Sequence, residues 1–147
     1  MTRRRSPGLR ALASYRLGDT EAGEIALRSF LARENPRVAE TIQLARQFSE
    51  AGRPAEAQRL YLSALATDPQ NQAALAAVVT GASATGDQAT LLRYTPDLLR
   101  TRKPSRTALT AALAALSPDD PAAAHLRTEL ARVLSGLPAG ATVPSGT

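Results

Sequence analysis

The chain has 147 residues, enough for one domain with its own apolar core. Alanine and leucine dominate its apolar residues, aromatic residues make up only 3% of it, and runs of β-branched residues are missing, which favours helices over strands. The absence of cysteine excludes disulfides and thiolate metal sites, and the net charge of +5 rests on arginine, because Lys103 is the one lysine. We therefore expect an all-α protein, and the preference for arginine together with so much alanine suggests a GC-rich bacterial gene.

Both ends of the chain predict disordered tails. Residues 1–5 include the basic run Arg3-Arg4-Arg5, and residues 136–147 are rich in glycine, proline and serine. No stretch reaches the roughly 18 apolar residues of a membrane-spanning helix. The basic start also lacks the apolar segment of a secretory signal. We expect a chain without a membrane span, cytoplasmic as given, or periplasmic if it is a fragment of an exported protein.

Apolar residues at helical spacing predict eight helices between the tails. Proline preceded by a good N-cap side chain, as in Ser6-Pro7, Asn35-Pro36, Asp68-Pro69 and Asp120-Pro121, predicts four of the starts. The expected helices cover about 7–17, 20–33, 37–50, 54–67, 70–84, 88–102, 105–116 and 121–135. Pro96 falls inside the sixth of these, where proline removes a hydrogen bond and clashes with the preceding turn. A kink or a break is therefore expected there, the break giving helices 88–94 and 96–102.

A repeat of 34 residues organises these helices into pairs. Gly18, Gly52 and Gly86 stand 34 residues apart, each between two predicted helices, where a tight turn favours positive φ. In the fourth pair Asp120 takes the place of the glycine. A fixed period of this length is typical of stacked helix pairs, none of which buries its apolar face alone. The expected domain covers residues 6–135, with units of about 6–35, 36–68, 69–103 and 104–135.

Residues 38–71 resemble a tetratricopeptide repeat (TPR). The family pattern asks for leucine, a small residue and an aromatic residue on the first helix, and then a glycine turn. Leu44, Ala45, Phe48 and Gly52 match it, and the match continues in the second helix and the next start with Ala57, Tyr61, Ala64 and Asp68-Pro69. Thr41 departs from the pattern, which expects a bulky aromatic residue. We expect the alanines to lie where the two helices touch, and Phe48 and Tyr61 to fill the space between successive pairs.

The resemblance implies a right-handed α-solenoid of about four antiparallel helix pairs. It also implies a non-enzymatic scaffold or adaptor that binds a peptide or a helix of another protein in a concave groove. In this family the first helix of each pair lines that groove. By register, the predicted groove residues are Leu12, Tyr15, Arg16, Ile42, Gln43, Arg46, Ser49, Glu50, Thr80 and Ser83. The groove lacks the lysine and asparagine clamp of chaperone-tail receptors, so helix binding or self-association fits better.

The sequence shows no catalytic or cofactor site. His125, the single histidine, has Glu129 four residues later, but two groups are too few for zinc and no nucleophile is indicated. Asp119-Asp120 precedes Pro121 and is better explained by helix capping. We therefore expect no enzyme, no metal and no cofactor.

Two other functions compete with the scaffold. RNA binding through helical hairpins is the first, although base-reading repeats need a 35-residue period, so nucleic acid is not the expected partner. The second is a segment of an envelope protein, because bacterial polysaccharide-export machines of this family carry long arrays of such repeats.

Overall fold

The structure, a computed structural model, describes residues 7–33 and 37–136. Its described residues form eight α-helices and no strand, which confirms the all-α prediction. The helices are α1 (Pro7–Arg16), α2 (Thr20–Leu31), α3 (Val38–Glu50), α4 (Pro54–Thr67), α5 (Gln72–Thr85), α6 (Gln88–Arg100), α7 (Arg106–Ala115) and α8 (Pro121–Leu134). Their ends agree with the predicted ranges to within two residues. The two predicted tails lie outside the described residues, apart from Gly136.

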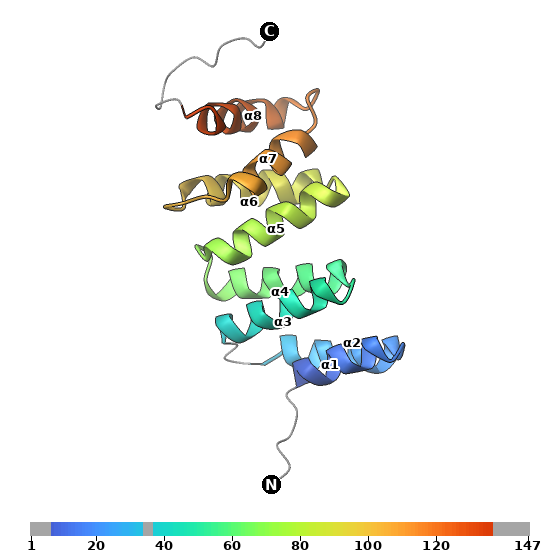
Figure 1. Ribbon diagram of the computed structural model, residues 1–147. Coiled ribbons are helices and arrows are strands. Elements are labelled where there is room, and N and C mark those ends of the chain that lie inside the picture. The colour runs from blue at the N-terminus through green and yellow to red at the C-terminus, as the bar shows by residue number, and fades with distance from the viewer. Residues whose placement is uncertain (1–6, 34–36, 137–147) are drawn as a thin grey trace. The chain divides into compact units, whose positions relative to one another are not determined.

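The chain divides into two compact units, residues 1–69 and 70–147. In the first unit, α1 packs against α2, α3 packs against α4, and α1 also contacts α3 (Figure 1). In the second unit, α5 contacts α6 and α7, while α8 contacts α6 and α7 (Figure 1). Each unit therefore consists of two helix pairs that pack on one another.

The three spaced glycines close the same turn. Gly18, Gly52 and Gly86 have φ angles of 82°, 77° and 70°, the left-handed region that favours glycine. In each turn the glycine N–H donates three residues back and the next N–H donates five residues back, to carbonyls of the preceding helix. These two bonds define a Schellman motif. The prediction of a tight positive-φ turn inside the first three pairs is confirmed.

Two of the four proline-based helix starts are placed by the structure as expected, and one is wrong. α1 begins at Pro7, and Asp120 caps α8 by accepting a hydrogen bond from the Ala122 N–H at 2.9 Å. Asp68, by contrast, ends α4, and α5 begins three residues after Pro69, with Asn71 accepting from the Ala74 N–H. An asparagine oxygen closer to the apolar residues of α5 therefore replaces the expected aspartate cap. Asn35-Pro36 lies outside the described residues.

The buried interior of the first unit contains the residues that the repeat pattern assigned to packing. Ala45, Ala57 and Ala64 are all at most 3% exposed, as expected where two helices touch closely. Phe48 is fully buried, and its ring meets Tyr15 of α1 edge-to-face at a centroid distance of 5.6 Å. Phe48 thus connects the second helix pair to the first, as predicted. Tyr61 is also buried.

Two glycines let α1 approach its neighbours. A Cβ atom on Gly8 would lie 2.5 Å from the Leu44 side chain, and one on Gly23 would lie 2.9 Å from the Tyr15 ring. Any side chain at Gly23 would have to displace an aromatic ring that is itself packed on Phe48. Glycine is therefore required by space at this helical position, and not by backbone conformation.

Side-chain hydrogen bonds tie the helix ends of the second unit together. Gln88, the first residue of α6, donates to the Ala115 carbonyl at the end of α7 at 2.8 Å and accepts from the Ser117 N–H. Arg106, the first residue of α7, donates to the Leu134 carbonyl at the end of α8 at 2.8 Å. These contacts place the end of α6, the start of α7 and the end of α8 at one end of the unit.

The predicted break at Pro96 is wrong, because α6 runs without interruption from Gln88 to Arg100. Pro96 cannot donate to the Leu92 carbonyl, so the helix continues with one bond fewer. Leu91, Thr95 and Leu98 are buried on one face of α6, and this packing spans the proline on both sides. The Thr95 hydroxyl is buried there without a hydrogen-bond partner. Tertiary packing thus overrides the local penalty.

Candidate interaction face

The ten predicted groove residues divide between the two units and between buried and accessible positions. Thr80 and Ser83 belong to α5 of the second unit, and the other eight belong to α1 and α3 of the first unit. Leu12, Tyr15 and Ile42 are buried. The residues that reach solvent are Arg16, Gln43, Arg46, Ser49, Glu50 and Thr80, together with the partly exposed Ser83.

The buried positions on α1 follow from a small rotation of that helix. Shifting the α3 residues Ala45 and Phe48 back by one repeat gives Ala11 and Ser14. Ala11 is fully buried, but Tyr15 rather than Ser14 carries the aromatic ring into the interior. The buried stripe of α1 is therefore rotated by about one residue relative to that of α3. This rotation moves Leu12 and Tyr15 away from solvent and leaves Arg16 exposed.

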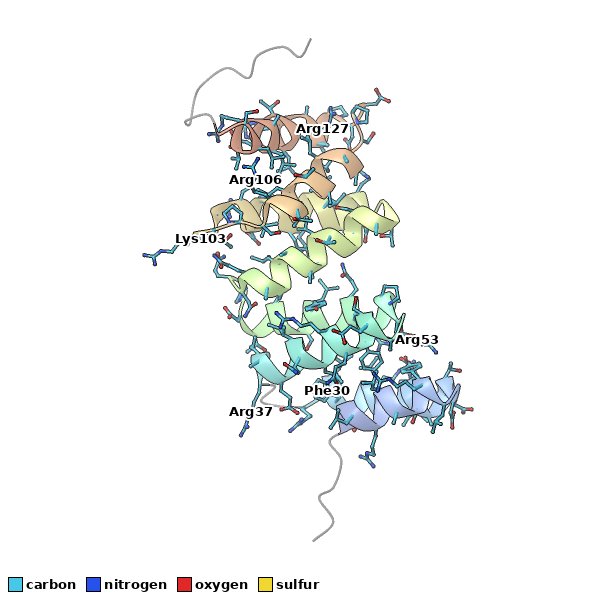
Figure 2. All side chains as sticks on the ribbon, in the orientation of Figure 1. Phe30, Arg37, Arg53, Lys103, Arg106 and Arg127 are labelled. Atoms are coloured by element: carbon cyan, nitrogen blue, oxygen red, sulfur yellow. The ribbon has the colours of Figure 1, made fainter. Side chains whose placement is uncertain are left out.

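Tyr15 belongs to a polar network inside the first unit. Its hydroxyl donates to the Glu24 carboxylate of α2 at 2.9 Å, and the Arg53 guanidinium lies 4.4 Å from the centre of its ring. Arg59 of α4 and Arg28 of α2 also donate to Glu24, at 2.9 and 3.0 Å. Figure 2 shows Arg53 at the turn between α3 and α4, on the side of the α1/α2 pair. The network therefore joins three helices of the unit.

The network shifts the pKa values of its members in opposite directions. Hydrogen bonds from Arg59 and then Tyr15 lower the pKa of Glu24 to about 2, against the effect of desolvation. Burial, followed by the hydrogen bond to Glu24, raises the pKa of Tyr15 to about 12. Glu24 is thus ionised and Tyr15 neutral across the physiological range, and this cluster holds helices together without exchanging protons near neutrality.

Glu24→Gln is expected to lower the free energy of unfolding by about 1–2 kcal/mol at neutral pH, because three donors lose an ionised acceptor. The folded pKa lies below the ordinary value of 4.5, so the ionic contribution is complete above that pH and disappears as the pH falls toward about 2. Urea unfolding at several pH values tests this. The difference from the parent chain should shrink between about pH 4.5 and 2, while Glu21→Gln, on an exposed site of α2, should change little at any pH.

α3 presents a polar face to solvent beside its buried stripe. We call Gln43, Arg46, Ser49 and Glu50, all exposed, the α3 polar face. It combines an amide, a cation, a hydroxyl and a carboxylate within two helical turns. The Arg46 guanidinium also lies close enough to Tyr61 to oppose the rise in the pKa of Tyr61 that burial causes. Such a set offers donors and acceptors to another chain but no pair arranged for proton transfer.

Two hollows in the first unit share Leu9, a residue that the sequence analysis did not select. The larger, of about 480 Å³, lies along α1 and is lined by Leu9, Leu12, Ala13, Arg16 and Leu17. The smaller, of about 270 Å³, lies where α1, α2 and α3 meet and is lined by Leu9, Phe30, Glu40, Gln43, Leu44 and Gln47. Leu9 and Leu17 are 46% and 86% exposed. Helical spacing was the signal that could have identified them, because Leu12 follows Leu9 by three residues and Leu17 follows Leu9 by eight.

Leu12, Arg16 and Gln43 are the predicted residues that line these hollows. The first unit thus carries an apolar surface on α1 that borders the α3 polar face through Leu9 and Gln43. This junction of exposed leucines and hydrogen-bonding groups is therefore the candidate interaction face of the first unit.

The described residues offer little for other chemistry. Within 7–33 and 37–136, no group of three or more histidine, cysteine, aspartate or glutamate residues could hold a metal ion. His125 is exposed on α8, one turn before Glu129. The hydrogen bond from Arg132 lowers the pKa of Glu129, and the charge of Arg132 adds to this effect. No helix of the described part is long and apolar enough to cross a membrane.

The 34-residue period and the helix pairs described above are the observations from which a function of this chain can be proposed. No family model, no curated protein and no solved structure matches the chain.

Proposed function

We propose that this chain is a TPR-like repeat protein, a right-handed α-solenoid of four helix pairs, that acts as a non-enzymatic scaffold. It binds a peptide or a helix of another protein along the first helices of its pairs. The proposal is supported by the identical Schellman turns at a 34-residue spacing. It is also supported by the buried alanines of α3 and α4 and by the contact of Phe48 with the preceding pair.

One observation carries the functional part of the proposal. The α3 polar face borders the hollow at Leu9, so that exposed hydrogen-bonding groups adjoin exposed leucines on the same unit. A partner helix would place its apolar side chains against Leu9 and Leu17 and its polar groups against Gln43 and Arg46. This division of roles is that of a helix bound in a groove.

Affinity capture from the native host, with the full chain as bait, tests this function. Arg46→Glu reverses one charge on the α3 polar face and is expected to reduce the recovery of specific partners about tenfold. Arg93→Glu makes the same charge reversal on α6, the second helix of its pair, where Arg93 is also exposed. This control variant should leave recovery unchanged. Tyr15→Ala is not a suitable probe, because Tyr15 is buried and its loss would disturb packing.

Two results would contradict the scaffold. Equal recovery with both charge reversals would show that the α3 polar face does not bind the partner. Tight, salt-sensitive retention of single-stranded RNA in a filter-binding assay, abolished by Arg46→Glu, would favour nucleic acid instead.

A further inference from the structure

A cleft of about 470 Å³ lies between α6 and α8 in the second unit, on helices that the proposed groove does not use. Its apolar lining consists mainly of Leu92, Pro96, Leu99, Leu126 and Val133. Of these five residues, Leu126 is buried and the other four are only half-buried. The cleft is therefore an apolar surface that the fold leaves partly uncovered.

The cleft is cationic at one end. Arg100 and Arg132 line it near the ends of α6 and α8. The hydrogen bond from Arg106 to the Leu134 carbonyl brings the α6–α7 loop to the same end, and with it Arg102 and Lys103. Figure 2 shows the Lys103 side chain extending away from the helices. Arg102, Lys103 and Arg106 are all exposed.

Few carboxylates balance this charge. Asp97 pairs with Arg100 at 3.2 Å, and Glu129 pairs with Arg132. The five cations at this end against these two carboxylates leave a net charge of +3. The N–H groups at the start of α7 add to the positive potential, whereas the carbonyls that end α6 and α8 reduce it.

The opposite end of the cleft is acidic. Asp87 caps the start of α6 and Asp120 caps the start of α8, with Asp119 beside it. The hydrogen bonds of Gln88 to Ala115 and Ser117 hold the start of α6 beside the end of α7, which leads directly into these residues. The apolar cleft thus runs from a carboxylate-bearing end to a cation-bearing end.

The geometry points to a second docking site, in which the α6/α8 cleft binds an amphipathic helix of a partner protein whose acidic residues lie against the cationic end. Apolar side chains of the helix occupy the space beside Leu92, Leu99 and Val133. Its carboxylates meet Arg102 and Lys103, and the opposite charges at the two ends fix its direction. The lining contains no phenylalanine, tyrosine or tryptophan, and its one aromatic side chain is the imidazole of His125, which favours a peptide over a run of stacked nucleic acid bases. This inference does not rest on the proposed groove.

Fluorescence anisotropy with the full chain tests the site. The probe is a labelled amphipathic helical peptide with leucine and alanine on its apolar face and glutamates clustered at one end, and its counterpart carries lysine in place of glutamate. The glutamate peptide is expected to bind in the micromolar range, and the lysine peptide at least tenfold more weakly. The double variant Arg102→Glu/Lys103→Glu should reduce affinity for the glutamate peptide about tenfold. Arg10→Glu/Arg37→Glu, the same charge change at exposed residues of the first unit, should leave it unchanged.

A second variant addresses the apolar part of the cleft. Leu99→Gln adds no charge and should also weaken the glutamate peptide several-fold, with helix content checked by circular dichroism. Because Arg102 and Lys103 are exposed in a loop, the charge variant remains informative if Leu99→Gln fails to fold. Arg46→Glu, which tests the proposed groove, should leave peptide binding at the cleft intact, so the two proposals can fail separately.

Four results would overturn the inference. The first is no binding of the glutamate peptide at roughly 100 µM. The second is equal affinity of both peptides, and the third is tighter binding of single-stranded oligouridylate that the Arg102→Glu/Lys103→Glu variant abolishes. The fourth is a concentration-dependent dimer that the same variant dissociates, which would make a second copy of the chain the occupant.

Discussion

Phe48→Ala is expected to lower the free energy of unfolding by about 3–5 kcal/mol, because it removes a fully buried aromatic ring and leaves a cavity. The loss should exceed that of an isolated core residue, since Phe48 also forms the edge-to-face contact with Tyr15 that joins the two pairs of the first unit. Thermal unfolding followed by far-ultraviolet circular dichroism should show a midpoint lower by about 10 °C.

Tyr94→Ala provides a matched aromatic truncation. Tyr94 lies on α6 and is only half-buried. The guanidinium of Arg93 lies 5.3 Å from the centre of the Tyr94 ring. Its loss is expected to lower the free energy of unfolding by roughly 1 kcal/mol. Equal effects of the two truncations, or a negligible effect at Phe48, would contradict the assignment of Phe48 as the bridge between pairs.

Pro96→Ala is expected to raise the free energy of unfolding by about 1–3 kcal/mol. Because α6 is continuous, an alanine N–H can restore the missing bond to the Leu92 carbonyl and remove the clash of the proline ring. The greater freedom of the unfolded chain without proline offsets part of this gain, roughly 0.4–1 kcal/mol. Urea unfolding monitored by circular dichroism measures the net change.

Pro54→Ala is the control for Pro96→Ala. Pro54 occupies the first position of α4, where a missing N–H has no intrahelical acceptor and the fixed φ suits the helix. This substitution is expected to leave stability unchanged or to lower it slightly. A lower stability of the Pro96→Ala chain would show instead that α6 depends on its proline.

The helix positions could be predicted because glycine and apolar spacing act locally. Gly18, Gly52 and Gly86 each need the left-handed conformation to close a Schellman turn, so their spacing in the sequence is the spacing of the turns. Continuity of α6 through Pro96 was not predictable in the same way. It depends on burial of Leu91, Thr95 and Leu98 against other helices, which no local pattern contains.

The candidate interaction face was predicted less completely than the fold. The α3 positions Gln43 and Arg46 are exposed, but Tyr15 is buried, because α1 is rotated by about one residue. Two features of the sequence permit that rotation. Gly23 leaves room for the Tyr15 ring, and the Glu24 carboxylate accepts a hydrogen bond from the Tyr15 hydroxyl. Neither feature indicates a rotation until the two helices are packed together.

Site-specific photo-crosslinking tests the proposed scaffold most directly. A photoreactive amino acid replaces Ser49 on the α3 polar face in one chain and Ser29 on α2 in another; both serines are exposed. In the native host, the Ser49 chain should form a covalent adduct with a discrete partner protein, and the Ser29 chain should not. Adducts from both positions, or from Ser29 alone, would contradict binding along the first helices.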